Sequence, residues 1–263
     1  MLKKLMRKLG YSSLPLILAQ SSAIMLSFPV LRDTFLHVKN SSNTPKNLRK
    51  YMDWSTRRAA IMRPKIKEVL KTGKALIVYH SNTGNTEKVA FAIAKGLRKA
   101  GLEPNLKKAS EALDEDYYKY DLVCIGTPCL HALPPPQIMK LVKKKFAGYR
   151  KTPSEVRVPS VTIPGKYALV FVTFSGPHVG VNEAYPAGKL LVQEFQHLGF
   201  DVKGEWYLVG EFHGWKEGST IGKLGDIRGR PNEKDVALIE EKAVQLVNSI
   251  NQSSDGNDVW VRQ

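Results

Sequence analysis

Cysteine is scarce in this chain, and its two residues, Cys124 and Cys129, are too few for a disulfide framework. Their spacing fits neither a Cys-x-x-Cys redox pair nor the ligand set of an iron–sulfur cluster. A reducing environment is the simplest interpretation, so we expect a cytoplasmic protein. We predict no metal site.

A hydrophobic run long enough to cross a bilayer is also missing. The most apolar stretch, residues 14–31, is interrupted by proline, glutamine and serine, whereas a spanning helix needs about 20 apolar residues. Three interpretations stay open: an interfacial amphipathic segment, a packed extension, or a spanning or cleaved segment. The first predicts that residues 1–31 bind an anionic membrane surface, with the protein peripheral on the inner face of the membrane.

Acidic residues are rare in the first quarter of the chain. Residues 1–72 hold 15 Lys/Arg against 3 Asp/Glu, which contributes +12 to the total of +16, while residues 73–263 hold 25 against 21. We therefore predict a basic, helical N-terminal extension over residues 1–72. Such a cluster favours anionic surfaces, whether membrane, nucleic acid or an acidic partner. Nucleic-acid binding is not expected of this protein.

One short segment has a composition suited to binding phosphate. Residues 81–86 read Ser-Asn-Thr-Gly-Asn-Thr, follow the apolar run Ala75–Tyr79, and open a helical pattern. A turn between a strand and a helix N-terminus directs backbone N–H groups at one spot, where the helix dipole adds partial positive charge. Three hydroxyl side chains add donors, and Gly84 permits a positive φ. The segment therefore predicts a phosphate socket made of neutral donors.

The same segment lacks two well-known nucleotide signatures. It contains no lysine, which excludes the Gly-x-x-x-x-Gly-Lys-Ser/Thr loop, and it contains no Gly-x-Gly-x-x-Gly dinucleotide fingerprint. An ordinary hydroxyl-rich turn between a strand and a helix is the alternative interpretation.

From residue 73 onward, strand and helix patterns alternate, which predicts an α/β domain over residues 73–252 and a polar tail over 253–263. Five strands and four helices are expected, with right-handed crossovers. We predict a three-layer open parallel five-stranded sheet of order 2-1-3-4-5, with its ligand at the carboxyl ends of strands one and three. The predicted strands are Ala75–Tyr79, Glu103–Lys107, Tyr120–Gly126, Tyr167–Phe174 and Trp206–Val209, and the predicted helices are 86–100, 135–146, 187–198 and 231–250.

The phosphate segment resembles the flavodoxin family, in which a Ser/Thr-x-Thr-Gly-x-Thr loop after the first strand holds the phosphate of FMN. Residues Ser81, Thr83, Gly84 and Thr86 match that pattern. A second segment, Gly126–Pro136, is similar to the Gly-Ser/Thr-Pro…Pro-Pro-Pro segment of prokaryotic flavodoxin-domain proteins. The resemblance covers about residues 74–250.

This resemblance implies a flavodoxin-like fold, FMN as cofactor, and a set of cofactor-binding residues in three loops; no catalytic residue is assigned. The implied residues are Ser81, Asn82, Thr83, Gly84, Asn85, Thr86, Thr127, Pro128, Cys129, Leu130, Phe174, Ser175, Gly176 and His178.

The implied activity is electron transfer with a redox protein or a small-molecule donor or acceptor. An FMN-dependent NAD(P)H/quinone-type oxidoreductase, associated with a membrane through its N-terminus, is the alternative. A third hypothesis is a binding module that has lost FMN, but the intact residues 83–86 argue against it.

The chain departs from the family in several ways. The loop after the third strand offers Cys129, Leu130 and His131 but no aromatic residue. No glycine follows Gly126 within it, so the peptide flip by which the family stabilises a flavin semiquinone would be more strained here. The domain is mildly basic, whereas flavodoxins are strongly acidic, which implies a raised reduction potential. A late segment, Gly225–Pro231, is also similar to the family, but the sequence suggests no role for it.

Overall fold

The computed structural model describes residue 70, residues 73–151 and residues 160–253. The predicted N-terminal extension, and with it the membrane contact of residues 1–31, lies outside these residues, as does the tail after residue 253. Within the described residues, no helix combines the length and the apolar character that crossing a bilayer requires.

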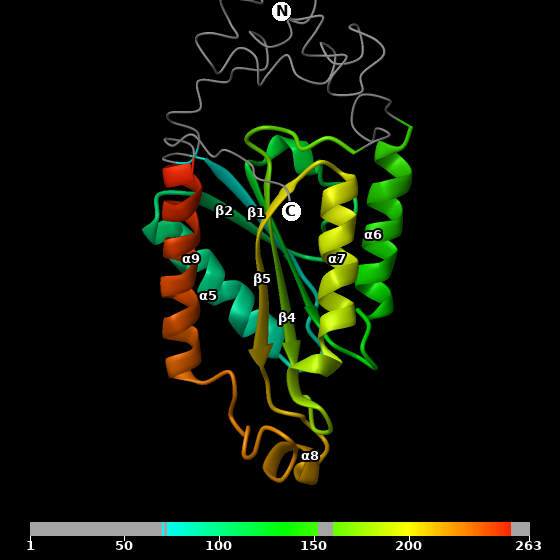
Figure 1. The fold of residues 1–263 in the computed structure, drawn as a ribbon, viewed down its shortest axis with the longest axis vertical. Coiled ribbons are helices and arrows are strands. Elements are labelled where there is room, and N and C mark those ends of the chain that lie inside the picture. The colour runs from blue at the N-terminus through cyan, green and yellow to red at the C-terminus, as the bar shows by residue number, and fades with distance from the viewer. Residues whose placement is uncertain (1–69, 71–72, 152–159, 254–263) are drawn as a thin grey trace, which may run out of the picture. The chain divides into compact units, whose positions relative to one another are not determined.

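Five parallel strands form one sheet in the order β2-β1-β3-β4-β5, as predicted (Figure 1). The burial pattern explains this order, because the three central strands are buried on both faces and only β2 and β5 lie at edges. The strands are β1 (Lys74–Tyr79), β2 (Glu103–Lys108), β3 (Leu122–Pro128), β4 (Tyr167–Phe174) and β5 (Asp201–Val209).

Helices cover both faces of the sheet and complete the three predicted layers (Figure 1). One face carries α5 (Asn85–Lys99) and α9 (Glu233–Ser253), and the other carries α6 (Pro136–Tyr149) and α7 (Tyr185–His197). Three short elements were not predicted, because each is too brief to show a periodic pattern. They are η2 (Tyr117–Lys119), η3 (Gly180–Glu183) and α8 (Lys216–Thr220).

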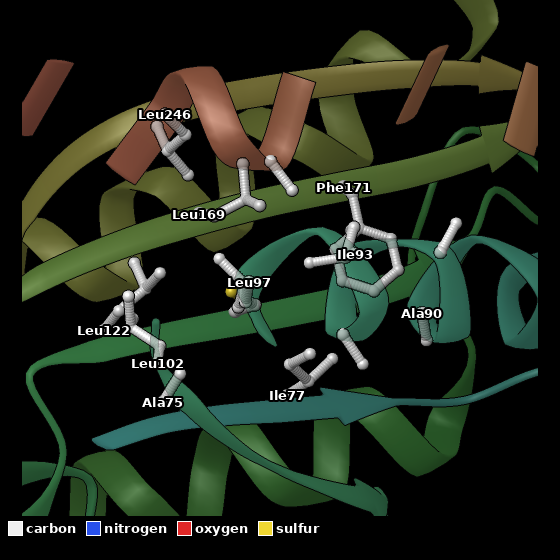
Figure 2. Close-up of a cluster of buried hydrophobic side chains, with 14 of the residues drawn as sticks. Ala75, Ile77, Ala90, Ile93, Leu97, Leu102, Leu122, Leu169, Phe171 and Leu246 are labelled. Atoms are coloured by element: carbon white, nitrogen blue, oxygen red, sulfur yellow. The ribbon is translucent and has the colours of Figure 1, made fainter. Parts of the chain in front are cut away.

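The period-two geometry of a strand divides the core into two parts. Along β1, Ile77 packs with α5 and α9, while its neighbours Leu76 and Val78 pack with α6 and α7. Figure 2 shows the first part, where Ile93 and Leu97 of α5 lie against the sheet. A continuous apolar strand is therefore what this sheet requires at its centre.

Most element boundaries differ by a few residues from the sequence-based expectation, and two differences at strand ends have a clear physical reason. Strand β5 begins at Asp201 rather than Trp206, because its first half is a polar edge segment whose backbone pairs with β4 without an apolar run. Strand β3 extends to Pro128, since Thr127 and Pro128 pair with β4 beyond the end of β1. Both residues therefore lie on the end of a strand rather than in a loop.

Helices α5 and α9 approach each other closely at Gly96. A Cβ atom placed there would lie 2.4 Å from the Glu240 carbonyl oxygen and 2.6 Å from the Ala243 Cβ. In contrast, a Cβ atom on Gly148 of α6 would meet no atom within 4 Å. The chain thus offers one helical glycine that packing requires and one that it does not.

We expect Gly96→Ala to lower the free energy of unfolding by about 1–3 kcal/mol, because α5 and α9 would have to separate. Gly148→Ala is the matched control and should raise it by about 0.5–1 kcal/mol through helix propensity alone. Urea unfolding followed by circular dichroism measures both. Equal effects of the two substitutions would contradict the close packing at Gly96.

Candidate functional site

The segment between β1 and α5 forms a tight turn at the carboxyl edge of the sheet. The Gly84 N–H donates to the Ser81 Oγ at 3.0 Å, and Gly84 adopts a φ of 93°. A Cβ atom on Gly84 would meet nothing within 4 Å, so open space lies beside the loop. Glycine is required here because other residues are strained in this conformation.

The amino end of α5 carries unused donors. The helix has no side-chain cap, and within the described residues the N–H groups of Asn82, Thr83 and residues 85–87 donate to no acceptor. A helix of this length with free N–H groups and a positive dipole end is suited to an anion. The residues present therefore fit a phosphate group such as that of FMN.

The side chains of Asn85 and Thr86 hold the loop in place. The Thr86 hydroxyl lies 2.7 Å from the Thr173 hydroxyl in a buried hydrogen bond. The Asn85 amide donates to the Glu211 carbonyl at 3.0 Å, and its oxygen lies 3.4 Å from the His213 Nε2. Both residues were predicted to bind cofactor, and that role stays a prediction; their side chains have protein partners, while their backbone N–H groups have none among the described residues.

The segment Gly225–Pro231, for which the sequence suggested no role, braces the loop after β5. The Glu211 N–H donates to the Arg230 carbonyl at 2.8 Å, and the Glu211 carboxylate accepts from the Gly229 N–H at 2.7 Å. Arg230 is fixed in turn by an ion pair with Asp235. This segment therefore fixes the Glu211 carbonyl that Asn85 contacts.

The loop after β3 contains a tight turn at residues 130–133. Leu130 and Leu133 exchange backbone hydrogen bonds of 2.9 and 3.0 Å, with His131 at φ 48° and Ala132 at φ 64° between them. The structure thus adopts left-handed backbone without glycine, at a cost of about 1–3 kcal/mol per residue. The two leucine side chains remain 39% and 52% exposed.

The loop after β4 uses its polar groups internally. The Ser175 hydroxyl donates to the Gly210 carbonyl at 2.8 Å, and Gly176 has a φ of 52°. Phe174 was predicted to contact the cofactor, but its side chain is 6% exposed and packs in the core. The exposed His178 ring lies 5.9 Å from the Trp215 ring, measured between centroids.

Cys129 joins the loops after β3 and β4. Its N–H donates to the Thr173 carbonyl at 2.8 Å, and its thiol donates to the Glu183 carbonyl at 3.0 Å. Burial raises the pKa of the Cys129 thiol, so the group stays protonated and remains a hydrogen-bond donor at neutral pH. Together with the Asn85–Glu211 and Ser175–Gly210 hydrogen bonds, this contact links the loops after β1, β3, β4 and β5.

Sequence reasoning did not include several residues that complete this site. Thr173 and Glu211 contact the phosphate loop, and Glu183 joins two other loops. Only Thr173 had a visible signal, since it is a polar residue near the end of an apolar strand. The others depend on contacts between distant segments.

The part of the chain that the structure describes contains no cluster of His, Cys, Asp or Glu suited to a metal ion. The described loops at this edge offer backbone amides, hydroxyls and exposed apolar side chains. These are the donor types that a phosphate and an aromatic ring system require.

Comparison with known proteins agrees with this geometry. The family model described as Flavodoxin matches residues 77–235. A flavodoxin of Aquifex aeolicus is 42% identical over 57 residues, which is 21% of this chain and 31% of that protein. An NAD(P)H dehydrogenase (quinone) of Rhizobium johnstonii is 40% identical over 53 residues, 18% of this chain and 27% of that protein. This chain thus matches less than a third of the length of these two relatives.

Two further similarities extend over a whole protein. An NAD(P)H dehydrogenase (quinone) of Archaeoglobus fulgidus is 23% identical over 199 residues, which is 64% of this chain and 98% of that protein. Among solved structures, a flavodoxin from the domain Archaea gives a TM-score of 0.47 at 15% identity, covering 67% of this chain and 98% of that one. Since the family model spans more than half of the sequence and the expected sheet order is present, this chain belongs to the flavodoxin family, whose cofactor is FMN.

Proposed function

We propose that this protein holds FMN with its phosphate at residues 81–86 and its ring system at the loops after β3 and β4, and that it acts in electron transfer. The observation that carries the proposal is the uncapped start of α5, where N–H groups without an acceptor follow Gly84 and open space lies beside that glycine. FMN, when bound, supplies the electron-accepting chemistry. A domain that had lost FMN would have no need to keep these donors uncapped.

The protein's own part is to position the cofactor and to shape the surface around it. The side chains of Asn85 and Thr86 fix the phosphate loop, and the Leu130–Leu133 turn and Gly176 shape the region assigned to the ring. No side chain in these loops is assigned a catalytic role.

A second candidate, an NAD(P)H-dependent quinone reductase, is favoured by the apolar surface at the same edge. Of the eleven large apolar side chains that are exposed among the described residues, eight lie in segments following β3, β4 and β5. An apolar rim suits an uncharged aromatic acceptor. The similarity to the Archaeoglobus protein along nearly its whole length points the same way. The eight residues are Leu130, Leu133, Val179, Tyr185, Phe212, Trp215, Ile221 and Leu224.

The FMN proposal predicts a yellow protein that releases FMN rather than FAD on denaturation. Gly84→Ala should weaken FMN binding at least about tenfold, because the new Cβ would occupy the open space and strain the turn. Gly165→Ala is the matched control. Gly165 also has a positive φ and free space for a Cβ atom, but it precedes β4 and so lies at the amino ends of the strands, away from the phosphate loop. Fluorescence titration with FMN measures both; equal losses of affinity would contradict the proposed phosphate site.

The quinone-reductase candidate predicts NAD(P)H oxidation with a quinone in the absence of any protein partner. In that case Leu133→Asn should lower kcat/KM for a lipophilic quinone several-fold, by removal of apolar contact, with little effect on ferricyanide reduction. Phe91→Asn on α5 is the control, because Phe91 is similarly exposed but lies outside the carboxyl-edge segments. Activity that requires a redox protein instead would favour the electron carrier.

Membrane association through residues 1–31 also stays a proposal, since that segment lies outside the described residues. Its support is the basic and apolar composition of the segment. The full chain should float with vesicles that contain phosphatidylglycerol, and a chain lacking residues 1–31 should not. Equal flotation of both chains would exclude this role.

A further inference from the structure

Glu183, at the end of η3, contacts both loops assigned to the flavin ring. Its Oε1 accepts the N–H groups of His178 and Val179, each at 2.8 Å. Its backbone carbonyl accepts the thiol of Cys129 at 3.0 Å. One residue therefore fixes the path of the loop after β4 and joins it to the loop after β3.

Glu183 is also unusual in its charge. Among residues 129–135 and 175–184 it is the single Asp, Glu, Lys or Arg, so these two loops carry one formal negative charge apart from their histidines. No basic side chain among the described residues forms an ion pair with it. The carboxylate is held by two neutral N–H donors rather than by a basic side chain.

The negative charge also acts on the neighbouring thiol. Glu183 contributes to the raised pKa of Cys129, after the larger effect of burial. This coupling agrees with the hydrogen bond between the Cys129 thiol and the Glu183 backbone carbonyl, where the two loops meet. An electron-accepting ring bound at this junction would experience the same field.

We propose that Glu183 is a positioning residue for the flavin ring and that its charge lowers the reduction potential of the bound FMN. The inference rests on the proposed FMN site. A negative charge near the ring opposes the additional negative charge that arrives on reduction, so it favours the oxidised cofactor. The same side chain, through its two hydrogen bonds, holds the loop against which the ring would lie.

The substitution Glu183→Gln tests the charge, because glutamine keeps the size and an accepting oxygen. We expect FMN to remain bound. The affinity for reduced FMN relative to oxidised FMN should rise about tenfold, which corresponds to an increase of about 30 mV in the two-electron reduction potential of the bound cofactor. Glu103→Gln is the matched control, since Glu103 is exposed at the start of β2, at the opposite edge of the sheet. Redox titration measures the potential, and an unchanged potential in Glu183→Gln would overturn the electrostatic role.

The substitution Glu183→Ala tests the positioning role without the cofactor. In the FMN-free full chain, loss of the two hydrogen bonds should free the loop and make the Cys129 thiol about tenfold more reactive towards an aromatic disulfide reagent. Glu183→Gln should cause a much smaller increase, because its amide oxygen can still accept a hydrogen bond. Cys124 is fully buried and serves as the unreactive internal reference.

The two measurements separate failure of this inference from failure of the FMN proposal. If the wild-type chain bound no FMN, the proposed function would fail, while thiol reactivity would still report on loop positioning. If FMN bound but Glu183→Ala left Cys129 unreactive, Glu183 would not be the residue that holds the loop.

Discussion

The buried hydrogen bond between the hydroxyl groups of Thr86 and Thr173 is the interaction on which the site depends. It joins the first turn of α5 to the carboxyl end of β4 at 2.7 Å. Because β4 also carries the carbonyl that accepts the Cys129 N–H, the same strand end fixes the phosphate loop and the loop after β3. Removing either hydroxyl would leave its buried partner unsatisfied, a loss of about 1–3 kcal/mol.

The arrangement separates two tasks between backbone and side chains. Side chains at residues 85, 86, 183 and 211 bind other groups of the protein, while the N–H groups at the start of α5 stay available. This division lets the site be preformed, since the loops are held by protein contacts that do not need the cofactor. The Gly225–Pro231 segment belongs to the same framework, because it supports Glu211 from outside.

Much of the fold could be predicted from the sequence because the central strands are continuous apolar runs. Strand β4 has the predicted bounds, Tyr167–Phe174, and the order of all five strands is the doubly wound order expected for alternating strands and helices. The first half of β5 escaped prediction, since an edge strand paired through its backbone has no need of apolar residues. Local pattern thus describes the centre of the sheet better than its edges.

The candidate site was less predictable, for a different reason. The Ser81–Thr86 motif is local, so its place between β1 and α5 could be anticipated. The contacts of Asn85 with Glu211 and of Cys129 with Glu183 join residues that are 126 and 54 positions apart. The left-handed turn at His131 and Ala132 ran against residue preference and is closed by the paired backbone of Leu130 and Leu133. Tertiary contacts decide such features, and a single sequence does not display them.

The absence of lysine from the Ser81–Thr86 loop has a consequence for how an anion would be held there. A socket of oriented amide dipoles acts over a short range and attracts an anion weakly from a distance, unlike a lysine or arginine clamp. The affinity of such a socket for phosphate would depend little on ionic strength. The socket itself would not neutralise the charge of a bound phosphate, because amide groups carry no net charge. Occupancy would therefore add negative potential to an edge with many exposed apolar side chains, so loaded and empty protein would present different surfaces to the same partner.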